Sequence, residues 1–375
     1  MRTFRVEFGR VEFSHEGLGP NSHSVHVGAG LLDRLGDLAR EAEISPGRAA
    51  IVTDRNVAPL YGERAKDSIA KAGFAVAMIE IAAGEASKSL VTYERVIDAM
   101  VEARLDRQSP VFALGGGVVG DLAGFAAATY MRGIPLVQVP TSVVAQVDSA
   151  LGGKTAIDHR RAKNLIGAFH QPRLIVADIA TLGSLPEREF REGLAEAIKY
   201  GAIMDAPMFA AIENDIVSIL SRDPAKLEEL VDRSLRCKAA VVSRDEREGG
   251  LRKILNFGHT VGHAIEAAGD YARYLHGEAA AIGMVVASRL SCLHAGLAES
   301  DQHRLVRLIE AAGLPTEMPD LGALPDAERD RFAKALELDK KRAGEAIDFV
   351  LVPELGRAIV RKLSFEQVTA AIQTA

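Results

Sequence analysis

A glycine-rich turn between an apolar run and a stretch of small residues constrains this chain more than any other feature. The run Val111-Phe112-Ala113-Leu114 leads into Gly115-Gly116-Gly117-Val118-Val119-Gly120, which fits G-x-G-x-x-G, and then into Asp121-Leu122-Ala123-Gly124. In a strand–turn–helix unit, glycines let the backbone approach a pyrophosphate, and the N-terminus of the helix offers free N–H donors. The pattern is weak by itself, but in this context it predicts a dinucleotide-binding unit.

Short apolar runs alternate with helical stretches through the first half of the chain. The runs are too short for helices and nearly all apolar, as strands covered on both faces must be. This alternation predicts a parallel, doubly wound sheet of Rossmann-like type. The predicted strands cover residues 49–53, 76–81, 111–114, 136–139 and 174–177, and a helix is expected at 91–103.

The second half changes to mainly helical spacing. We expect helices at 189–203, 227–242 and 278–293, a β-hairpin at 349–352 and 358–360, and a last helix at 365–373. A chain of 375 residues is long enough for two domains. The predicted fold is therefore α/β, with a nucleotide-binding domain at 1–186 followed by a mainly helical domain at 187–375 that binds metal and substrate.

Composition excludes several classes of protein. The net charge of −6 gives no basic field for nucleic acid. No apolar run reaches the roughly 18 residues that a membrane span needs, and the N-terminus has no apolar signal core. The two cysteines, Cys237 and Cys292, are interpreted as reduced thiols. We therefore expect a soluble cytoplasmic protein that acts on a small molecule.

The ribose-binding acid of a standard Rossmann unit is missing. It normally stands about 20 residues after the turn, where this chain has Val137-Gln138-Val139-Pro140-Thr141. Asp54 instead ends an earlier apolar run, so we expect the adenosine end of the nucleotide near Asp54, in a non-standard arrangement. The stretch Gly152-Gly153-Lys154-Thr155 looks like the end of a P-loop, but no glycine stands five residues before Gly153, which excludes that motif.

Histidines and carboxylates in the second half form a candidate metal site. His259 and His263 are four residues apart, on one helical face, and His276 follows. Upstream, Glu192 and Glu196 place two carboxylates on one face. Two neutral imidazoles with one carboxylate suit zinc and leave a position open for a substrate oxygen. The spacing alone does not decide which two histidines bind.

Several cations and polar residues surround these two motifs. Lys154 is notable because few other charges stand near it, and such a lysine usually has an anionic partner. Cations facing a metal would suit a substrate with phosphate or carboxylate groups. The set comprises Arg132, Asp148, Lys154, Lys163, Asn164, Lys199, Lys238, Arg252 and the pair Lys340-Lys341.

Long stretches from about Asp54 to Lys341 together resemble the 3-dehydroquinate synthases, a family of sugar phosphate cyclases. The motifs that carry the resemblance lie at 84–89, 115–133, 140–158, 163–169, 192–201, 245–248 and 252–266. Departures are small. Ser142 stands where a second threonine is common, Ala156 and Asp158 stand where glycine and asparagine are usual, and His170 stands where tyrosine is usual. None of these positions is a proposed metal ligand.

The resemblance implies a Rossmann-like N-terminal domain, a helical C-terminal domain, an active site in the cleft, NAD+, a divalent metal (zinc, with cobalt as an alternative) and a homodimer. It implies that Glu196, His259 and His276 hold the metal, so that His263 faces the substrate. The implied substrate-binding and catalytic set is Arg132, Asp148, Lys154, Asn164, Lys199, Lys238, Arg252, Asn256, His263 and one of Lys340 or Lys341. The implied cofactor contacts are Asp54, Asn56, Glu85, Lys88, Gly116, Gly117, Val118, Asp121, Thr141, Ser142, Lys154, Lys163, Thr181 and Leu182.

The activity that the resemblance implies is conversion of 3-deoxy-D-arabino-heptulosonate 7-phosphate to 3-dehydroquinate and phosphate, a step toward aromatic amino acids in the shikimate pathway. Two alternatives stay open. One is another sugar phosphate cyclase, whose substrate lacks the carboxylate. The other is a metal-dependent alcohol or glycerol dehydrogenase, which would release NADH stoichiometrically and gives no reason for so many cations.

Overall fold

The computed structural model describes residues 1–7, 22–160, 162–343 and 346–373, without the side chains of residues 338–343. The chain forms two compact units: Met1–Leu185 with Leu227–Arg247 is unit 1, and Pro186–Lys226 with Glu248–Ala375 is unit 2. The division into functional domains at 1–186 and 187–375 stays a prediction. The packing units differ from it, because residues 227–247 pack with unit 1. Within the described ranges, no helix has the length and apolar character that crossing a membrane requires.

Unit 1 is built on a seven-stranded sheet in the order β1-β2-β9-β6-β5-β3-β4. β1 pairs with β2 in antiparallel register, and the other neighbouring strands run parallel. All five predicted strands are confirmed, while the pair β1 and β2 was not predicted. The strands are β1 (Arg2–Glu7), β2 (Ser22–Gly28), β3 (Arg48–Asp54), β4 (Ala75–Ile81), β5 (Val111–Gly115), β6 (Leu136–Pro140) and β9 (Leu174–Asp178).

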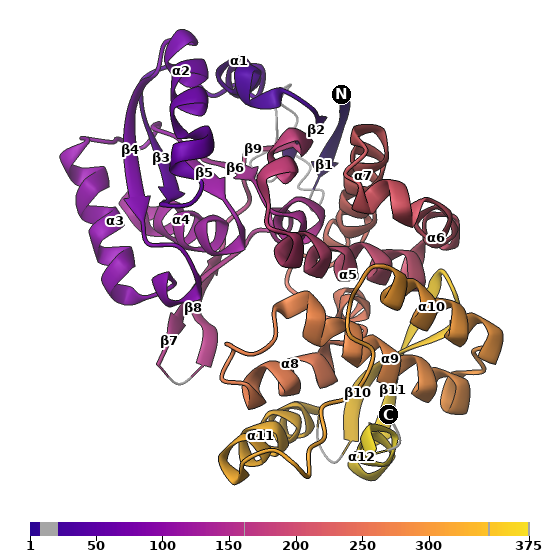
Figure 1. The fold of residues 1–375 in the computed structure, drawn as a ribbon. Coiled ribbons are helices and arrows are strands. Elements are labelled where there is room, and N and C mark those ends of the chain that lie inside the picture. Colours follow the sequence, from indigo (N-terminus) through magenta and orange to yellow (C-terminus); the bar gives the residue numbers. More distant parts are fainter. Residues whose placement is uncertain (8–21, 161, 344–345, 374–375) are drawn as a thin grey trace. The chain divides into compact units, whose positions relative to one another are not determined.

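Alternate residues of each central strand belong to opposite faces of this sheet. Ala49 and Ile51 of β3 pack into an apolar cluster with helices α1 (Leu35–Glu41) and α2 (Glu63–Lys71). Ala50 and Val52 pack into a second cluster with helices α3 (Leu90–Glu102) and α4 (Gly117–Thr129). The helices therefore cover both faces of the sheet (Figure 1), which confirms the doubly wound α/β prediction. The helical segments of unit 1 are η1 (Leu31–Arg34), α1 (Leu35–Glu41), η2 (Ala58–Gly62), α2 (Glu63–Lys71), η3 (Glu85–Ser87), α3 (Leu90–Glu102), α4 (Gly117–Thr129), η4 (Tyr130–Arg132), η5 (Ala145–Ser149), η6 (Ile179–Ser184) and most of α7 (Pro224–Val242).

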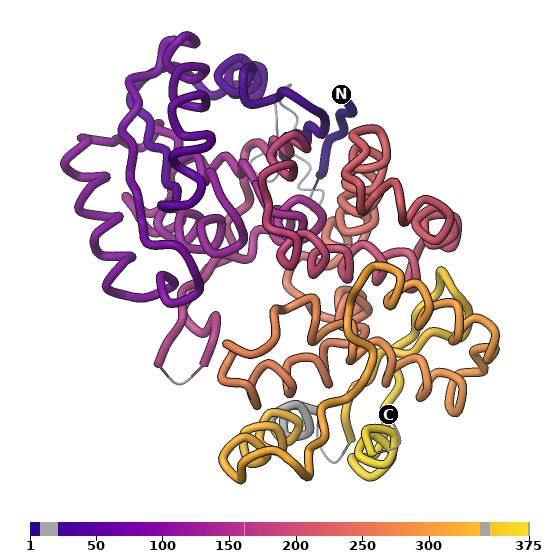
Figure 2. The backbone as a smooth tube through the Cα atoms, in the orientation of Figure 1, coloured from indigo at the N-terminus to yellow at the C-terminus, as the bar shows by residue number. Residues whose placement is uncertain are grey.

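A separate two-stranded sheet joins β6 to β9. It consists of β7 (Lys154–His159) and β8 (Ala162–Phe169), which pair in antiparallel register, and it extends away from the large sheet (Figure 2). Lys154 thus begins a strand instead of a helix, in agreement with the exclusion of a P-loop.

Unit 2 is mainly helical, as predicted. Its helical segments are α5 (Glu187–Met204), α6 (Ala206–Leu220), η7 (Leu251–Asn256), α8 (His259–Ala268), α9 (His276–Ala295), α10 (Glu299–Ala311), α11 (Asp326–Ala343) and α12 (Phe365–Gln373). The expected C-terminal hairpin is formed by β10 (Ala346–Glu354) and β11 (Arg357–Ser364). The helices expected at 189–203, 278–293 and 365–373 are confirmed as α5, α9 and α12.

Candidate metal centre and dinucleotide site

The glycine turn lies where the strand order of the sheet reverses. After β3 the chain places β4 on one side of β3 and then returns to the other side for β5. Ligands of open α/β sheets bind in the crevice at such a switch point, beyond the carboxyl ends of the strands. Asp54 ends β3 and the glycine turn follows β5, so the two features lie at neighbouring strand ends. The topology therefore supplies the physical basis for expecting Asp54 near the nucleotide.

Local hydrogen bonds hold the Asp54 carboxylate at the end of β3. The Asp54 carboxylate accepts from the backbone N–H of Asn56 at 2.8 Å and of Val57 at 3.1 Å. Such a turn holds the carboxylate next to its own backbone. Asn56 itself is exposed.

Two serine hydroxyls lie against the glycine turn. A Cβ atom at Gly116 would be 3.4 Å from the Ser142 Oγ, and one at Gly117 would be 3.3 Å from the Ser149 Oγ. The N–H of Thr141 donates to the carbonyl of Gly115 at 3.0 Å. The predicted cofactor residues of the turn (Gly116, Gly117 and Val118) are therefore next to Thr141 and Ser142, and helix α4 starts at Gly117. Free N–H groups at this helix start suit a pyrophosphate.

A buried ammonium group connects further predicted residues. Lys88 is 4% exposed, and its Nζ donates to Asp121 at 2.8 Å and to the Asn164 amide oxygen. Beside this group, Lys163 pairs with Glu85 at 3.1 Å. Burial lowers the pKa of Lys88, but Asp121 and then Glu85 outweigh burial, so that the pKa is raised and the ammonium stays charged. Residues 85, 88, 121, 163 and 164 thus form one polar cluster, in which all but Asn164 are charged.

Gln146 connects the ends of two strands, a role that the sequence analysis missed. The ladder between β6 and β9 holds for only two residue pairs, after which the strands separate. The fully buried Gln146 amide fills this fork: its nitrogen lies 3.0 Å from the carbonyl oxygens of Pro140 and Asp178 and 3.1 Å from the Thr181 hydroxyl, and its two N–H groups are shared among these three acceptors. Thr181 is therefore held in place by Gln146, and Leu182 beside it is buried. The contacts of these two residues with a cofactor stay predictions.

Asp148 and Lys238 form a pair in unit 1. The Lys238 Nζ lies 2.9 Å from the Asp148 Oδ1 and also donates to the backbone carbonyl oxygen of Asp148 at 2.9 Å. Asp148 lies on η5, a π-helical turn, and such turns are frequent at functional sites. Lys154 is exposed at the start of β7.

Arg132 lies in a different part of unit 1. It is exposed, and it lines a hollow of about 830 Å³ that includes neither the glycine turn nor Lys238. Three further arginines line the same hollow: Arg107, Arg173 and Arg247. A concentration of guanidinium groups suits an anion, but the part of Arg132 in substrate binding stays a prediction.

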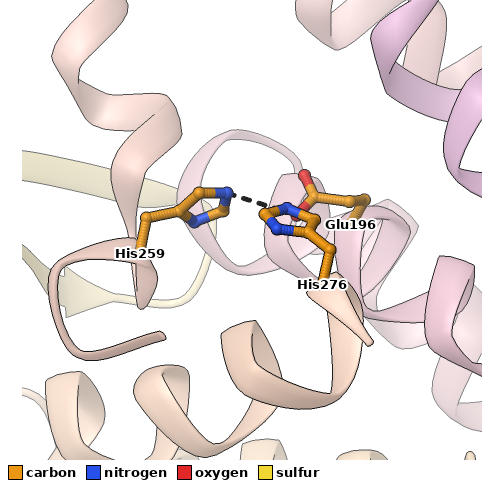
Figure 3. Close-up of side chains that lie close together, drawn as sticks. All are labelled: Glu196, His259 and His276. Carbon is orange, nitrogen blue, oxygen red and sulfur yellow. Dashed lines mark ion pairs between the residues drawn. The ribbon is translucent and has the colours of Figure 1, made fainter. Parts of the chain in front are cut away.

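Three side chains from three helices of unit 2 form the candidate metal centre. Glu196 lies on α5, His259 begins α8 and His276 begins α9, and Figure 3 shows the three side chains pointing toward one another. One ligand atom of each lies within 4.8 Å of the others. Glycines allow the close contact of α8 and α9 that this requires, because a Cβ at Gly283 would overlap the carbonyl oxygen of Gly258.

The unsatisfied Glu196 oxygen at this centre fits a shared cation better than a hydrogen bond to either imidazole. The Glu196 Oε1 lies 3.4 Å from the Nε2 of His259 and 3.4 Å from the Nε2 of His276. It is buried, and among the described residues it has no hydrogen-bond partner. Ligands at about 2.1 Å from a tetrahedral zinc ion are separated by about 3.4 Å. The orphaned oxygen and the two nitrogens therefore fit zinc or a similar divalent ion.

The protonation states of Glu196 and His259 support the same reading. Burial raises the pKa of the Glu196 carboxyl, but Lys199 and then His259 outweigh burial and hold the pKa well below its usual range. Burial, helped by Lys199, lowers the pKa of His259 to about 3, so this imidazole is neutral. The His259 Nδ1 lies 3.1 Å from the carbonyl oxygen of Phe257, which assigns the proton to Nδ1 and the lone pair to Nε2.

The other predicted residues of unit 2 differ in how closely they contact this centre. Lys199 is buried and pairs directly with Glu196. The His263 ring lies 5.3 Å from that of His259 and 6.2 Å from that of His276, between centroids. Arg252 is buried, and the Asn256 amide donates to Glu248 at 3.3 Å. Lys340 and Lys341 lie on α11, where their side chains are outside the described residues.

Comparison with known proteins shows the family of the chain. The family model of the 3-dehydroquinate synthase N-terminal region matches residues 78–192, and that of the C-terminal region matches residues 193–342. The 3-dehydroquinate synthase of Symbiobacterium thermophilum is 50% identical over 345 residues, which cover 92% of this chain and 94% of the relative.

Solved structures of related cyclases have the same fold. A 2-epi-5-epi-valiolone synthase from Streptomyces hygroscopicus, with NAD+ and Zn2+ bound, has a TM-score of 0.84 and 29% identity, covering 96% of this chain and 99% of its own. A 2-deoxy-scyllo-inosose synthase complexed with carbaglucose-6-phosphate, NAD+ and Co2+ has a TM-score of 0.85 and 25% identity, with full coverage of both chains. The curated relatives are more similar in sequence than these cyclases are, and the chain belongs to the 3-dehydroquinate synthase family.

Proposed function

We propose that the chain converts 3-deoxy-D-arabino-heptulosonate 7-phosphate to 3-dehydroquinate and inorganic phosphate, with no net redox change. The observation that carries the proposal is the orphaned Glu196 Oε1, which lies 3.4 Å from two imidazole nitrogens, in a chain that also has the glycine turn of a dinucleotide site. Family membership supplies the substrate.

NAD+ and a divalent metal, when bound, supply a transient oxidation that acidifies the neighbouring proton of the substrate, and a later re-reduction. The chain itself contributes binding, orientation and charge. The switch point between β3 and β5 receives the dinucleotide, with Asp54 toward its adenosine end and the N-terminus of α4 toward its phosphates. Glu196, His259 and His276 hold the metal.

The charged groups of both units have complementary tasks in this proposal. Lys199 neutralises part of the negative charge of Glu196 and keeps that carboxylate ionised. Lys238, which Asp148 holds in place, presents an ammonium group to an anionic substrate. Arg132, Lys154, Asn164, Arg252, Asn256, His263 and one of Lys340 or Lys341 complete the proposed substrate-binding set.

One assay separates the proposed activity from its rivals. Purified protein is mixed with NAD+, Zn2+ and the heptulosonate phosphate, and inorganic phosphate is followed together with the absorbance band of NADH. Phosphate release without NADH build-up is expected, because the cofactor is regenerated. NADH build-up with simple alcohols would show a dehydrogenase instead, and turnover only of a sugar phosphate without a carboxylate would show another cyclase.

Variants test the metal assignment within the same assay. Glu196→Ala and His276→Ala should each abolish phosphate release, and full activity in either would refute the assignment. Glu213→Gln is a suitable control because that carboxylate pairs with Arg304, at 2.8 Å, instead of a histidine.

We also propose that the protein is a cytosolic homodimer, on the basis of its family. Light scattering of the purified protein should give twice the mass of one chain. A mass equal to a single chain at micromolar concentration would contradict the dimer.

A further inference from the structure

Three carboxylates surround the first turn of α9, where His276 stands. Glu192 accepts a hydrogen bond from the N–H of Gly277 at 2.8 Å, and Glu278 accepts one from the N–H of Leu275 at 2.9 Å. These two acids satisfy backbone donors on either side of His276, as N-terminal caps do. Glu192 therefore orients the helix instead of joining Glu196 as a ligand.

The third carboxylate faces the ring of His276. The Glu266 Oε2 lies 3.4 Å from the His276 Nδ1, on the opposite side of the imidazole from the Nε2 that faces Glu196. Glu266 is buried on α8, with 7% of its surface exposed. A buried carboxylate beside a ring nitrogen accepts the N–H of that nitrogen and leaves the lone pair on the other one.

The two histidine ligands thus have corresponding partners of different charge. The Nδ1 of His259 faces the neutral carbonyl of Phe257, whereas the Nδ1 of His276 faces a charged group. A charge-assisted hydrogen bond is roughly twice as strong as one between neutral groups. It also makes the imidazole a better electron donor toward a cation.

We propose that Glu266 is a positioning residue that orients the His276 ring and strengthens its bond to the metal. The inference rests on the proposed metal assignment and adds to it a residue that the sequence analysis left without a role. It also explains why the ligand atoms of His263, Glu266 and His276 form a second group within 4.8 Å. In our interpretation this second group is not another metal site, because the Nδ1 of His276 is occupied by its hydrogen bond to Glu266.

The test measures zinc affinity by chelator competition, zinc stoichiometry by elemental analysis, and NAD+ affinity, on the full-length protein. Glu266→Gln keeps the shape of the side chain and an acceptor oxygen but removes the charge, and Glu266→Ala removes both. Loss of an outer-shell partner typically weakens metal binding by about 10- to 100-fold. We expect about tenfold weaker zinc binding in Glu266→Gln, a larger loss in Glu266→Ala, one zinc per chain throughout, and unchanged NAD+ affinity.

Controls separate this inference from general loss of structure. Glu213→Gln removes a carboxylate elsewhere in unit 2 and should bind zinc like the parent protein. Visible bands of the Co2+-loaded protein should shift in Glu266→Gln and stay unchanged in Glu213→Gln. Circular dichroism of the zinc-free variants shows whether they are folded, and Glu266→Gln, being isosteric, keeps the test usable if Glu266→Ala is not.

Two results would overturn the proposal while leaving the metal centre in place. One is parental zinc affinity in both Glu266 variants. The other is two zinc ions per parent chain and one in Glu266→Gln, which would make Glu266 a ligand. Retention of zinc in Glu196→Ala would instead refute the underlying metal assignment, so the two failures are distinguishable.

Discussion

Adding one methyl group at Gly277 should separate α5 from α9, two of the three helices that carry the candidate metal ligands. A Cβ at this position would lie 2.6 Å from the carbonyl carbon of Glu192 and would overlap its oxygen. Carbon atoms in favourable contact are about 3.5–4.0 Å apart, so α9 must move away from α5 by about 1 Å. Glu196 is on α5 and His276 begins α9. The same movement therefore lengthens the 3.4 Å separation between the Glu196 Oε1 and the His276 Nε2. Metal–ligand distances tolerate only about 0.2 Å.

Gly277→Ala should therefore lose at least about tenfold in zinc affinity, a lower limit by analogy with outer-shell changes. Overpacking should also cost about 1–3 kcal/mol, which the better helix propensity of alanine offsets by about 1 kcal/mol. Chelator competition and urea unfolding of the zinc-free protein measure the two effects. Gly47→Ala, where a Cβ meets nothing within 4 Å, is the matched control. Parental zinc affinity in Gly277→Ala would refute the argument that this glycine sets the helix spacing.

Three further predictions concern unit 1. Gln146→Leu should destabilise the fold by about 1–3 kcal/mol and weaken NAD+ binding, because the carbonyl of Pro140 loses the Gln146 donor while that of Asp178 keeps the Thr181 hydroxyl; unchanged urea unfolding would contradict this. Lys88→Met should cost about 3 kcal/mol in the same measurement, since it leaves Asp121 without its cation, and parental stability would show the pair to be dispensable. Burial lowers the pKa of His23 to about 4. Below about pH 6.5 this histidine is therefore protonated in the unfolded chain, whereas in the folded chain it stays neutral down to about pH 4. Stability should fall by about 3 kcal/mol across that window; His23→Leu should remove this part of the pH dependence, and an unchanged slope would contradict the assignment.

The regular elements of the fold were predictable because their periodicities are strong. Apolar runs at 49–53 and 174–177 indicate strands covered on both faces. The structure buries both runs, and residues 49–52 belong to the apolar clusters on both faces of the sheet. The hairpin of β7 and β8 was not predicted, because every residue of β8 is exposed or half-buried and the strand lacks a continuous apolar pattern. The packing of residues 227–247 with unit 1 was equally hidden, since an amphipathic helix does not reveal which surface it covers.

The candidate site was only partly predictable from residue spacing. The interval between His259 and His263 predicts a shared helical face, but the structure brings His259 together with His276, from the start of the next helix. That choice depends on how α8 and α9 cross, which the glycines at the crossing permit. Glu266 could have been noticed, because a lone acid stands three residues after His263 in an otherwise apolar stretch. Gln146 carries a similar signal, as an amide between the buried Ala145 and Val147.

Anomalous diffraction at the zinc edge, from crystals grown with Zn2+ and NAD+, tests the central claim most directly. We expect one peak per chain, at about 2.0–2.2 Å from the Glu196 Oε1 and from the Nε2 atoms of His259 and His276. A peak bonded to His263 and Glu266, or no peak near Glu196, would contradict the account.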